Sequence, residues 1–160
     1  MRILLAAPGD SYSLVNFRDQ FSDWGHDVTH WDFTTQPEWH IEEGKRFDLL
    51  FHVLVNEEIS AESLADLKRL NLVAKALLFC CDDTWRLPVS LAKAGNYDIV
   101  ITTDPDAIGL YRAHGHTHVK LVQYGVNPAA WQPCGEPWKS GPDVVFVGQN
   151  YVGRWDFIKA

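Results

Sequence analysis

Short apolar runs alternate along this chain with segments in which apolar residues recur at intervals of three and four. Runs that are apolar nearly throughout are typical of parallel strands covered on both faces. They predict strands at Ile3–Ala7, Val28–Phe33, Leu49–Val55, Ala76–Cys81, Ile99–Thr103, Lys120–Tyr124 and Val144–Val147. The alternation therefore predicts an α/β fold, a Rossmann-like doubly wound parallel sheet in three α/β/α layers.

Two of the predicted helices have an apolar stripe. The first stripe consists of Leu14, Phe17, Phe21 and Trp24. Gly25 follows and is expected to end that helix, because glycine readily adopts the left-handed conformation found after many helices. Ser60 is expected to cap the second helix, since its side chain can accept a hydrogen bond from the first turn. The residues of this helix expected to face the sheet are Leu64, Leu67 and Leu70.

Two later helices are predicted from proline and glycine. Pro88 suits the first turn of a short helix that ends at Gly95. Asp104 with Pro105 predicts the start of the next helix, and Gly115 predicts its end. In doubly wound sheets, ligands bind beyond the carboxyl ends of the strands, so we expect the chemistry in the loops that follow the strands.

Composition restricts the class of protein. Apolar residues make up 46% of the chain and charged residues 22%, the profile of a globular domain that can bury a core. No apolar run approaches the roughly 20 residues of a membrane span. The net charge of −7 argues against a nucleic-acid partner and against docking on anionic lipid. The N-terminal apolar run is too short for a signal peptide, and the three cysteines lack metal-binding spacing, so the predicted location is the cytoplasm.

The loop after the first predicted strand, at residues 8–12, resembles part of a nucleotide site. It could place backbone N–H groups and a helix N-terminus near an anion. However, it lacks the GxGxxG pattern, so a dinucleotide site is not expected. Asp32 occupies the place of a ribose-binding acid, and without the glycines we interpret it as an ordinary loop carboxylate.

The adjacent carboxylates of Asp82 and Asp83 follow a predicted buried strand, with Trp85 close behind. One interpretation is that they supply a general base or bind hydroxyl groups, with the indole as a stacking face for a sugar or base. The other is that one of them caps the following helix. Both interpretations stay open, and each can hold for a different aspartate.

Other catalytic patterns are missing or unconvincing. His114, His116 and His118 are expected to point in different directions, since a helix end, a turn and a strand start separate them, so no metal site is predicted there. The GxSxG and GxxxxGK[ST] motifs are absent, which removes the main support for hydrolases and nucleotide triphosphatases. A receiver domain would need acids directly after the first strand and a lysine after the fifth, and this chain has neither.

Five short motifs occur in an order and spacing that resemble one family. They are Leu14–Val28, Tyr97–Thr102, Tyr111–Gly115, Tyr124–Pro133 and Asp143–Gly148. They are similar to segments of GT-B glycosyltransferases: the first helix with its Gly-His-acid ending, the next strand and helix, the domain junction and the start of the second domain. With Asp82 and Asp83 after the fourth strand, the resemblance is to the CgeB-like and family 4-like glycosyltransferases.

The resemblance implies a nucleotide-sugar-dependent transferase of the hexosyltransferase type, with its active site in a cleft between two Rossmann-like domains. This chain would supply the acceptor side, where an inverting enzyme uses a carboxylate or a histidine to take the proton of the acceptor hydroxyl. The candidate catalytic residues are Asp10, Asp82 and Asp83. The candidate acceptor-binding residues are Gly9, Ser11, Tyr12, Glu57, Trp85, Tyr124 and Asn127.

The resemblance also divides the chain. Residues 1–141 correspond to the N-terminal domain, and residues 142–160 to a linker and the truncated start of a C-terminal donor-binding domain. Gly148, Asn150 and Arg154 are expected in its donor-side loop. No metal or cofactor is expected, because in this family the second domain holds the donor diphosphate. The chain alone is therefore expected to lack transferase activity.

The apolar run Val144–Val147 is expected to add an edge strand to the first domain, or to pair with a second copy in a homodimer, because an exposed strand edge invites pairing. The expected partners are thus a sugar or glycan acceptor and the C-terminal donor-binding domain. Two other classes stay open: a non-catalytic Rossmann-like module that binds a ligand or a protein, and a nucleotide-binding oxidoreductase domain.

Overall fold

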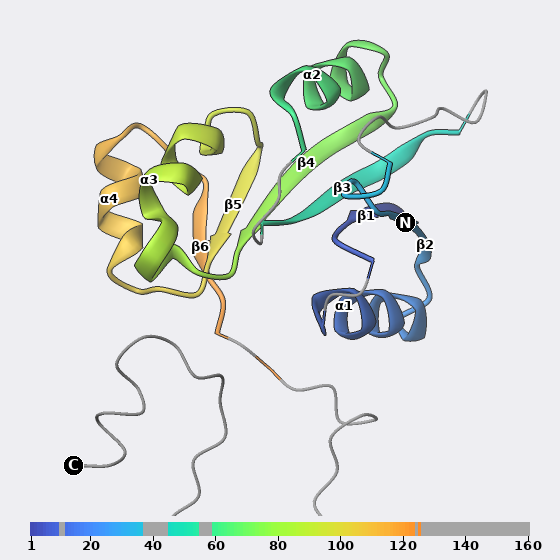
Figure 1. Cartoon of the computed structure of the whole chain (residues 1–160), viewed down its shortest axis with the longest axis horizontal. Helices are drawn as coiled ribbons and strands as arrows, with labels where there is room; N and C mark the ends of the chain where they lie inside the picture. The colour runs from blue at the N-terminus through green and yellow to red at the C-terminus, as the bar shows by residue number, and fades with distance from the viewer. Residues whose placement is uncertain (10–11, 37–44, 55–58, 124, 126–160) are drawn as a thin grey trace, which may run out of the picture. The chain divides into compact units, whose positions relative to one another are not determined.

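The computed structural model describes residues 1–9, 12–36, 45–54, 59–123 and 125, with backbone only at residues 12–15. Within them the strands are β1 (Arg2–Ala6), β2 (Asp27–Trp31), β3 (Phe47–Leu54), β4 (Val73–Cys80), β5 (Ile99–Thr102) and β6 (Val119–Leu121). The helices are α1 (Tyr12–Asp23), α2 (Ala61–Arg69), α3 (Asp83–Ala94) and α4 (Ala107–Ala113) (Figure 1). All neighbouring strands are parallel, so the predicted Rossmann-like α/β fold is confirmed.

The strand order of the sheet is β2-β1-β3-β4-β5-β6. The chain moves from β1 to one side to form β2, and then crosses to the other side of β1 to form β3. Leu4 of β1 accordingly pairs with Thr29 of β2 and with Leu50 of β3. In open α/β sheets this change of direction opens a crevice at the carboxyl ends of the strands, where ligands bind.

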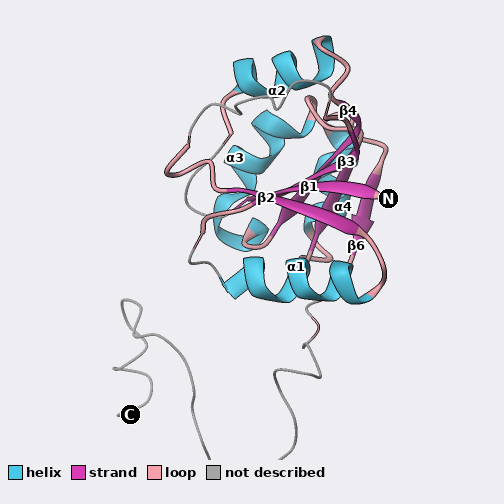
Figure 2. Cartoon of the chain, turned by 90° about the vertical axis from the view of Figure 1, so that its right-hand side faces the viewer, coloured by secondary structure: helices cyan, strands magenta, loops and turns pink. Residues whose placement is uncertain are grey.

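The two faces of the sheet are covered by different helices. Successive residues of a strand point to opposite faces, so Leu50 and Leu78 face one side while Phe51 and Phe79 face the other. The first side packs against α2, α3 and α4, and the second against α1 (Figure 2). The ring of Phe17 in α1 lies 4.9 Å from that of Phe51 and 5.0 Å from that of Phe79, measured between centroids. These rings form the core under α1.

The end of α1 differs in part from the prediction. Gly25 has a φ of 80° and follows the helix, as predicted. Phe17 and Phe21 pack against the sheet, but Trp24 lies beyond the last helical residue and is 64% exposed. The apolar stripe therefore ends one turn earlier than the sequence indicated. The side chain of Leu14 lies outside the described residues.

The start of α2 is confirmed and its end is not. The Ser60 hydroxyl accepts a hydrogen bond from the Ser63 backbone N–H at 3.0 Å, and Leu64 and Leu67 are buried. Leu70 does not face the sheet, because the helix ends at Arg69 and Leu70 is 42% exposed.

The boundaries of α3 and α4 were less well predicted. Pro88 lies inside α3 and not in its first turn, because the helix already begins at Asp83. Asp104 precedes α4 by a turn in which its Oδ1 accepts a hydrogen bond from the Asp106 backbone N–H at 2.9 Å. Gly115, with a φ of 87°, follows α4 as predicted. The described residues all belong to the unit Met1–Ala130, so the predicted domain boundary and the strand at 144–147 lie outside them. Over these described residues no helix is long and apolar enough to cross a membrane.

A histidine is buried in the middle of the sheet. His52 of β3 is 0% exposed, and its Nδ1 lies 2.6 Å from the Tyr97 hydroxyl oxygen. Its ring meets that of Phe33 edge-on, with centroids 5.3 Å apart. Burial and, to a smaller extent, the positive charge of Lys93 together lower the pKa of His52 to about 3. The histidine is therefore neutral in the folded protein.

We predict that His52 makes the protein less stable in mild acid. In the unfolded chain a histidine binds a proton below about pH 6.5, whereas folded His52 does not until about pH 3, so the free energy of unfolding falls as the pH drops through this window. The His52→Asn variant can keep a partner for Tyr97 and removes the titration. Urea unfolding at pH 7, 6 and 5 should show a decline smaller by on the order of 2 kcal/mol for the variant than for the unsubstituted chain. Equal declines in the unfolding free energy of the two proteins would contradict the prediction. A difference between them that is the same at every pH would instead reflect packing lost in the variant.

Candidate functional site

The structure brings some of the predicted site residues together and separates others. Asp82, Asp83 and Trp85 lie together where β4 leads into α3, and Gly9 lies after β1, with β3 between these two strands. For Tyr12 the structure describes the backbone alone, as the first residue of α1. The remaining predictions lie outside the described residues: Asp10, Ser11, Glu57, Tyr124, Asn127, Gly148, Asn150 and Arg154.

The two adjacent aspartates have opposite environments. Asp83 is 1% exposed, and each of its carboxylate oxygens lies 3.0 Å from the hydroxyl of Tyr111, which donates to them. As the first residue of α3, this carboxylate also lies where the helix dipole favours negative charge. A buried, hydrogen-bonded carboxylate is not accessible to a ligand. Asp83 therefore acts as an internal anchor of the helix start.

Asp82 occupies the N-cap position of α3 without using its side chain there. Its backbone carbonyl accepts hydrogen bonds from the N–H groups of Trp85 and Arg86, at 3.0 and 2.9 Å. The carboxylate is exposed and makes no capping hydrogen bond. Asp82 and Trp85 are three positions apart in the chain, so both belong to the first turn of α3. The indole is 84% exposed.

A further carboxylate adjoins this turn from the next loop. The Thr84 hydroxyl donates a hydrogen bond to Oδ2 of Asp104, at 3.1 Å. Asp104 follows β5, whose Thr102 pairs with Cys80 of β4. The sequence indicated Asp104 as the start of a helix and not as a site residue, although its place after a predicted strand was the available signal. We define the exposed residues Asp82, Thr84 and Trp85, together with Asp104, as the β4–β5 edge surface.

The cysteine beneath this surface is not a nucleophile. Cys80 is 1% exposed and is not in a disulfide. Burial raises the pKa of its thiol to about 12, and the negative charge of Asp83 adds to the rise. The Tyr111 hydroxyl also contacts its Sγ, at 3.4 Å. Cys80 is therefore a buried thiol in the core, as the sequence indicated.

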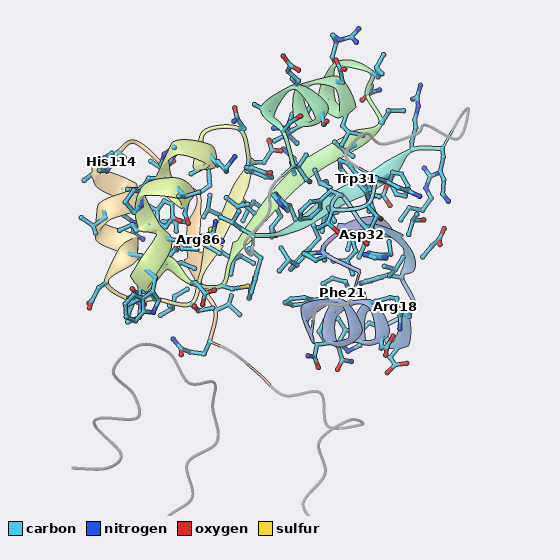
Figure 3. The ribbon with its side chains drawn as sticks, viewed as in Figure 1. Arg18, Phe21, Trp31, Asp32, Arg86 and His114 are labelled. Carbon is cyan, nitrogen blue, oxygen red and sulfur yellow. The ribbon has the colours of Figure 1, made fainter. Side chains whose placement is uncertain are left out.

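Gly9 and Asp32 meet beyond the ends of β1 and β2. A Cβ atom on Gly9 would lie 2.5 Å from Oδ2 of Asp32, closer than real Cβ atoms come to other atoms. The other carboxylate oxygen of Asp32, a residue labelled in Figure 3, accepts hydrogen bonds from the Thr34 hydroxyl at 2.6 Å and from the Thr34 backbone N–H at 3.0 Å. The hydroxyl contact is the main reason why the pKa of Asp32 is lowered. The Asp32 side chain therefore stabilises the turn at residues 32–34, and Gly9 packs closely against it.

The histidines predicted to diverge belong to separate positions around the end of α4. Nδ1 of His114 lies 2.8 Å from the Leu110 carbonyl oxygen, and the ring of His116 meets that of Tyr111 edge-on. His118 is exposed just before β6. In the part of the chain that the structure describes, no three His, Cys, Asp or Glu side chains gather in a way that could hold a metal ion.

Comparison with known proteins leaves the function open. No family model matches this sequence, and no curated protein matches it. Among solved structures, the chain is similar to the crystal structure of adenylate cyclase from Rhodopirellula baltica, with 18% sequence identity and a TM-score of 0.44. The match covers 71% of this chain and 85% of the other. A likeness this distant carries no argument about activity.

We predict that Gly9→Ala disrupts the Asp32 turn. The added methyl group clashes with Oδ2 of Asp32, so the carboxylate must shift, and weakening the hydrogen bonds that its Oδ1 accepts from Thr34 should cost about 1 kcal/mol of unfolding free energy at neutral pH. The pKa of Asp32 should then rise toward its ordinary value, which carboxyl ¹³C NMR across a pH titration measures directly.

Gly109→Ala is the matched control for this substitution. Gly109 lies inside α4 with nothing within 4 Å of an added Cβ, so alanine there should stabilise the protein by roughly 0.5–1 kcal/mol. If Gly9→Ala left both the stability and the pKa of Asp32 unchanged, the close approach of Gly9 to Asp32 would be refuted.

Proposed function

We propose that this chain is the acceptor-binding half of a nucleotide-sugar-dependent glycosyltransferase, and that the β4–β5 edge surface binds the acceptor sugar. The observation that carries the proposal is that the first turn of α3, beyond the carboxyl end of a parallel strand, exposes both an indole, Trp85, and a carboxylate that makes no capping hydrogen bond, Asp82. The motif order that resembles GT-B glycosyltransferases supports the same class of protein.

The chemistry of a sugar acceptor fits this pair of side chains. The C–H face of a pyranose can stack on an indole, while the hydroxyl groups at its rim need hydrogen-bond acceptors. The Trp85 side chain is 84% exposed, so most of its indole surface is accessible to a ligand that stacks on it. Asp104 adds a second carboxylate within reach of the same turn through Thr84.

The proposal assigns different roles to the two aspartates. Asp82 would accept the proton of the attacking acceptor hydroxyl, because its carboxylate is exposed and makes no capping hydrogen bond. Asp83 would not touch the acceptor, because it is buried under the helix start and bonded to Tyr111. Transfer would also require a nucleotide-sugar bound by a donor-binding domain, which the resemblance places after residue 141.

We predict that Trp85→Ala and Asp82→Asn each weaken sugar binding by roughly tenfold. The first substitution removes the stacking face, and the second removes a charged hydrogen-bond acceptor while keeping the side-chain shape. Saturation-transfer NMR and calorimetry with a panel of methyl glycosides measure the affinity. In an assay that includes a donor-binding domain and a nucleotide-sugar, Asp82→Asn should lower sugar transfer by about 10²–10⁴-fold.

The chain offers a matched control for each variant. Trp24 is another largely exposed tryptophan, at the end of α1, and Asp106 is another exposed aspartate at a helix start that makes no capping hydrogen bond. Trp24→Ala and Asp106→Asn should leave glycoside affinity unchanged. If the unsubstituted chain bound none of the glycosides, or if the control variants lost as much affinity as the test variants, the proposed acceptor surface would be wrong and a non-catalytic module would be favoured.

A further inference from the structure

Tyr111 links α4 to the first turn of α3. Its side chain is 0% exposed and lies in the core cluster between the sheet and these two helices, next to Leu78, Ala94 and Val119. Its hydroxyl is the hydrogen-bond donor to both carboxylate oxygens of Asp83, 28 residues earlier in the chain. Tyr111 is the first residue of the Tyr111–Gly115 motif. Packing in the core explains its aromatic ring, but it does not explain its hydroxyl group.

The residue that accepts the Tyr111 hydrogen bond, Asp83, is close in sequence to the exposed residues of the β4–β5 edge surface. Asp83 comes directly after Asp82 and two residues before Trp85. Burying a carboxylate is unfavourable unless donors satisfy it, so the position of Asp83 is tied to that of the Tyr111 hydroxyl. Any shift of Asp83 would move Asp82 and Trp85 with it, because all three residues belong to the same helical turn.

The loops that follow β4 and β5 are also held by hydrogen bonds. The Thr103 hydroxyl donates to the Cys81 carbonyl at 3.2 Å, and the Asp104 backbone N–H donates to the Thr102 hydroxyl at 3.1 Å. The first of these bonds joins the β4 and β5 loops, and the second fixes the β5 loop internally. The Thr84 hydroxyl ties the first turn of α3 to the β5 loop through Asp104, and the bond from Tyr111 reaches the same turn from α4.

We propose that Tyr111 is a positioning residue for the β4–β5 edge surface, acting through the buried carboxylate of Asp83. This inference rests on the proposed function for the identity of the ligand, a sugar hydroxyl acceptor, but the positioning itself does not depend on the ligand. Tyr111 holds the first turn of α3 in one arrangement, so that the Asp82 carboxylate and the Trp85 indole keep a fixed spacing. Preorganisation of this kind raises affinity and orients the reacting hydroxyl.

The Tyr111→Phe variant tests the hydrogen bond while keeping the ring in the core. We expect the Trp85 indole N–H resonance to shift, and the backbone amides of Trp85 and Arg86, which bond to the Asp82 carbonyl, to exchange about tenfold faster with solvent. Amides of the β3 and β4 strands should keep their exchange rates. Affinity for the methyl glycosides should fall by roughly fivefold to tenfold.

Two further variants separate positioning from a general loss of stability. Asp83→Asn keeps an oxygen that accepts a hydrogen bond from Tyr111, so this variant should resemble the unsubstituted chain in amide exchange and in glycoside affinity. Asp83→Leu removes the acceptor and should behave like Tyr111→Phe. Tyr97→Phe is the matched control, because it removes the tyrosine hydroxyl that contacts His52, away from the first turn of α3. It should leave the Trp85 resonance unchanged.

The outcomes that overturn the proposal are distinct from those that overturn the function. If Tyr111→Phe sped up exchange equally across the sheet and the helices, or left the Trp85 indole resonance in place, Tyr111 would have a purely structural role. If the unsubstituted chain bound no methyl glycoside while Tyr111→Phe still loosened the first turn of α3 selectively, the acceptor assignment would fail and the positioning would stand.

Discussion

Parallel strands in one sheet require the chain to return across a face of the sheet between every two strands, and in this protein each described strand pairs in that way. Two consequences follow from this constraint. The central strands are mostly apolar because helices cover them, and the carboxyl ends of all the described strands meet at one edge. Side chains that follow different strands, such as Thr84 after β4 and Asp104 after β5, therefore come within hydrogen-bond distance although 20 residues separate them. The chemistry proposed for this chain depends on that edge.

Adjacent residues at this edge acquire different properties from their surroundings. Asp82 and Asp83 have the same side chain, yet one is exposed and the other is 1% exposed. The difference arises because the first turn of α3 points one carboxylate to solvent and the other toward Tyr111. A buried carboxylate stabilises the fold only when it is satisfied, so the pair divides into a solvent-facing residue and an anchor. The exposed indole of Trp85 adds an apolar component to the solvent-facing side.

Local patterns in the sequence predicted the presence of the helices and strands better than the residues at which they begin and end. The apolar runs and the caps at Ser60 and Gly25 were sufficient for the order of strands and helices. The start of β4 was placed too late, because the exposed Lys75 interrupts the apolar pattern near the beginning of that strand. The burial of Asp83 could not be read from the sequence, because it depends on Tyr111 and on the parallel sheet that brings α4 beside α3. Long-range partners decide such differences, and residue type and spacing do not encode them locally.

The most direct test of this account is a titration of the ¹⁵N-labelled chain with methyl glycosides, followed residue by residue in two-dimensional NMR. The account predicts that the largest chemical-shift changes occur at residues 82–85, including the Trp85 indole N–H, and at Asp104. Changes centred elsewhere, for example around Gly9 and Asp32, or no changes at saturating glycoside, would contradict it.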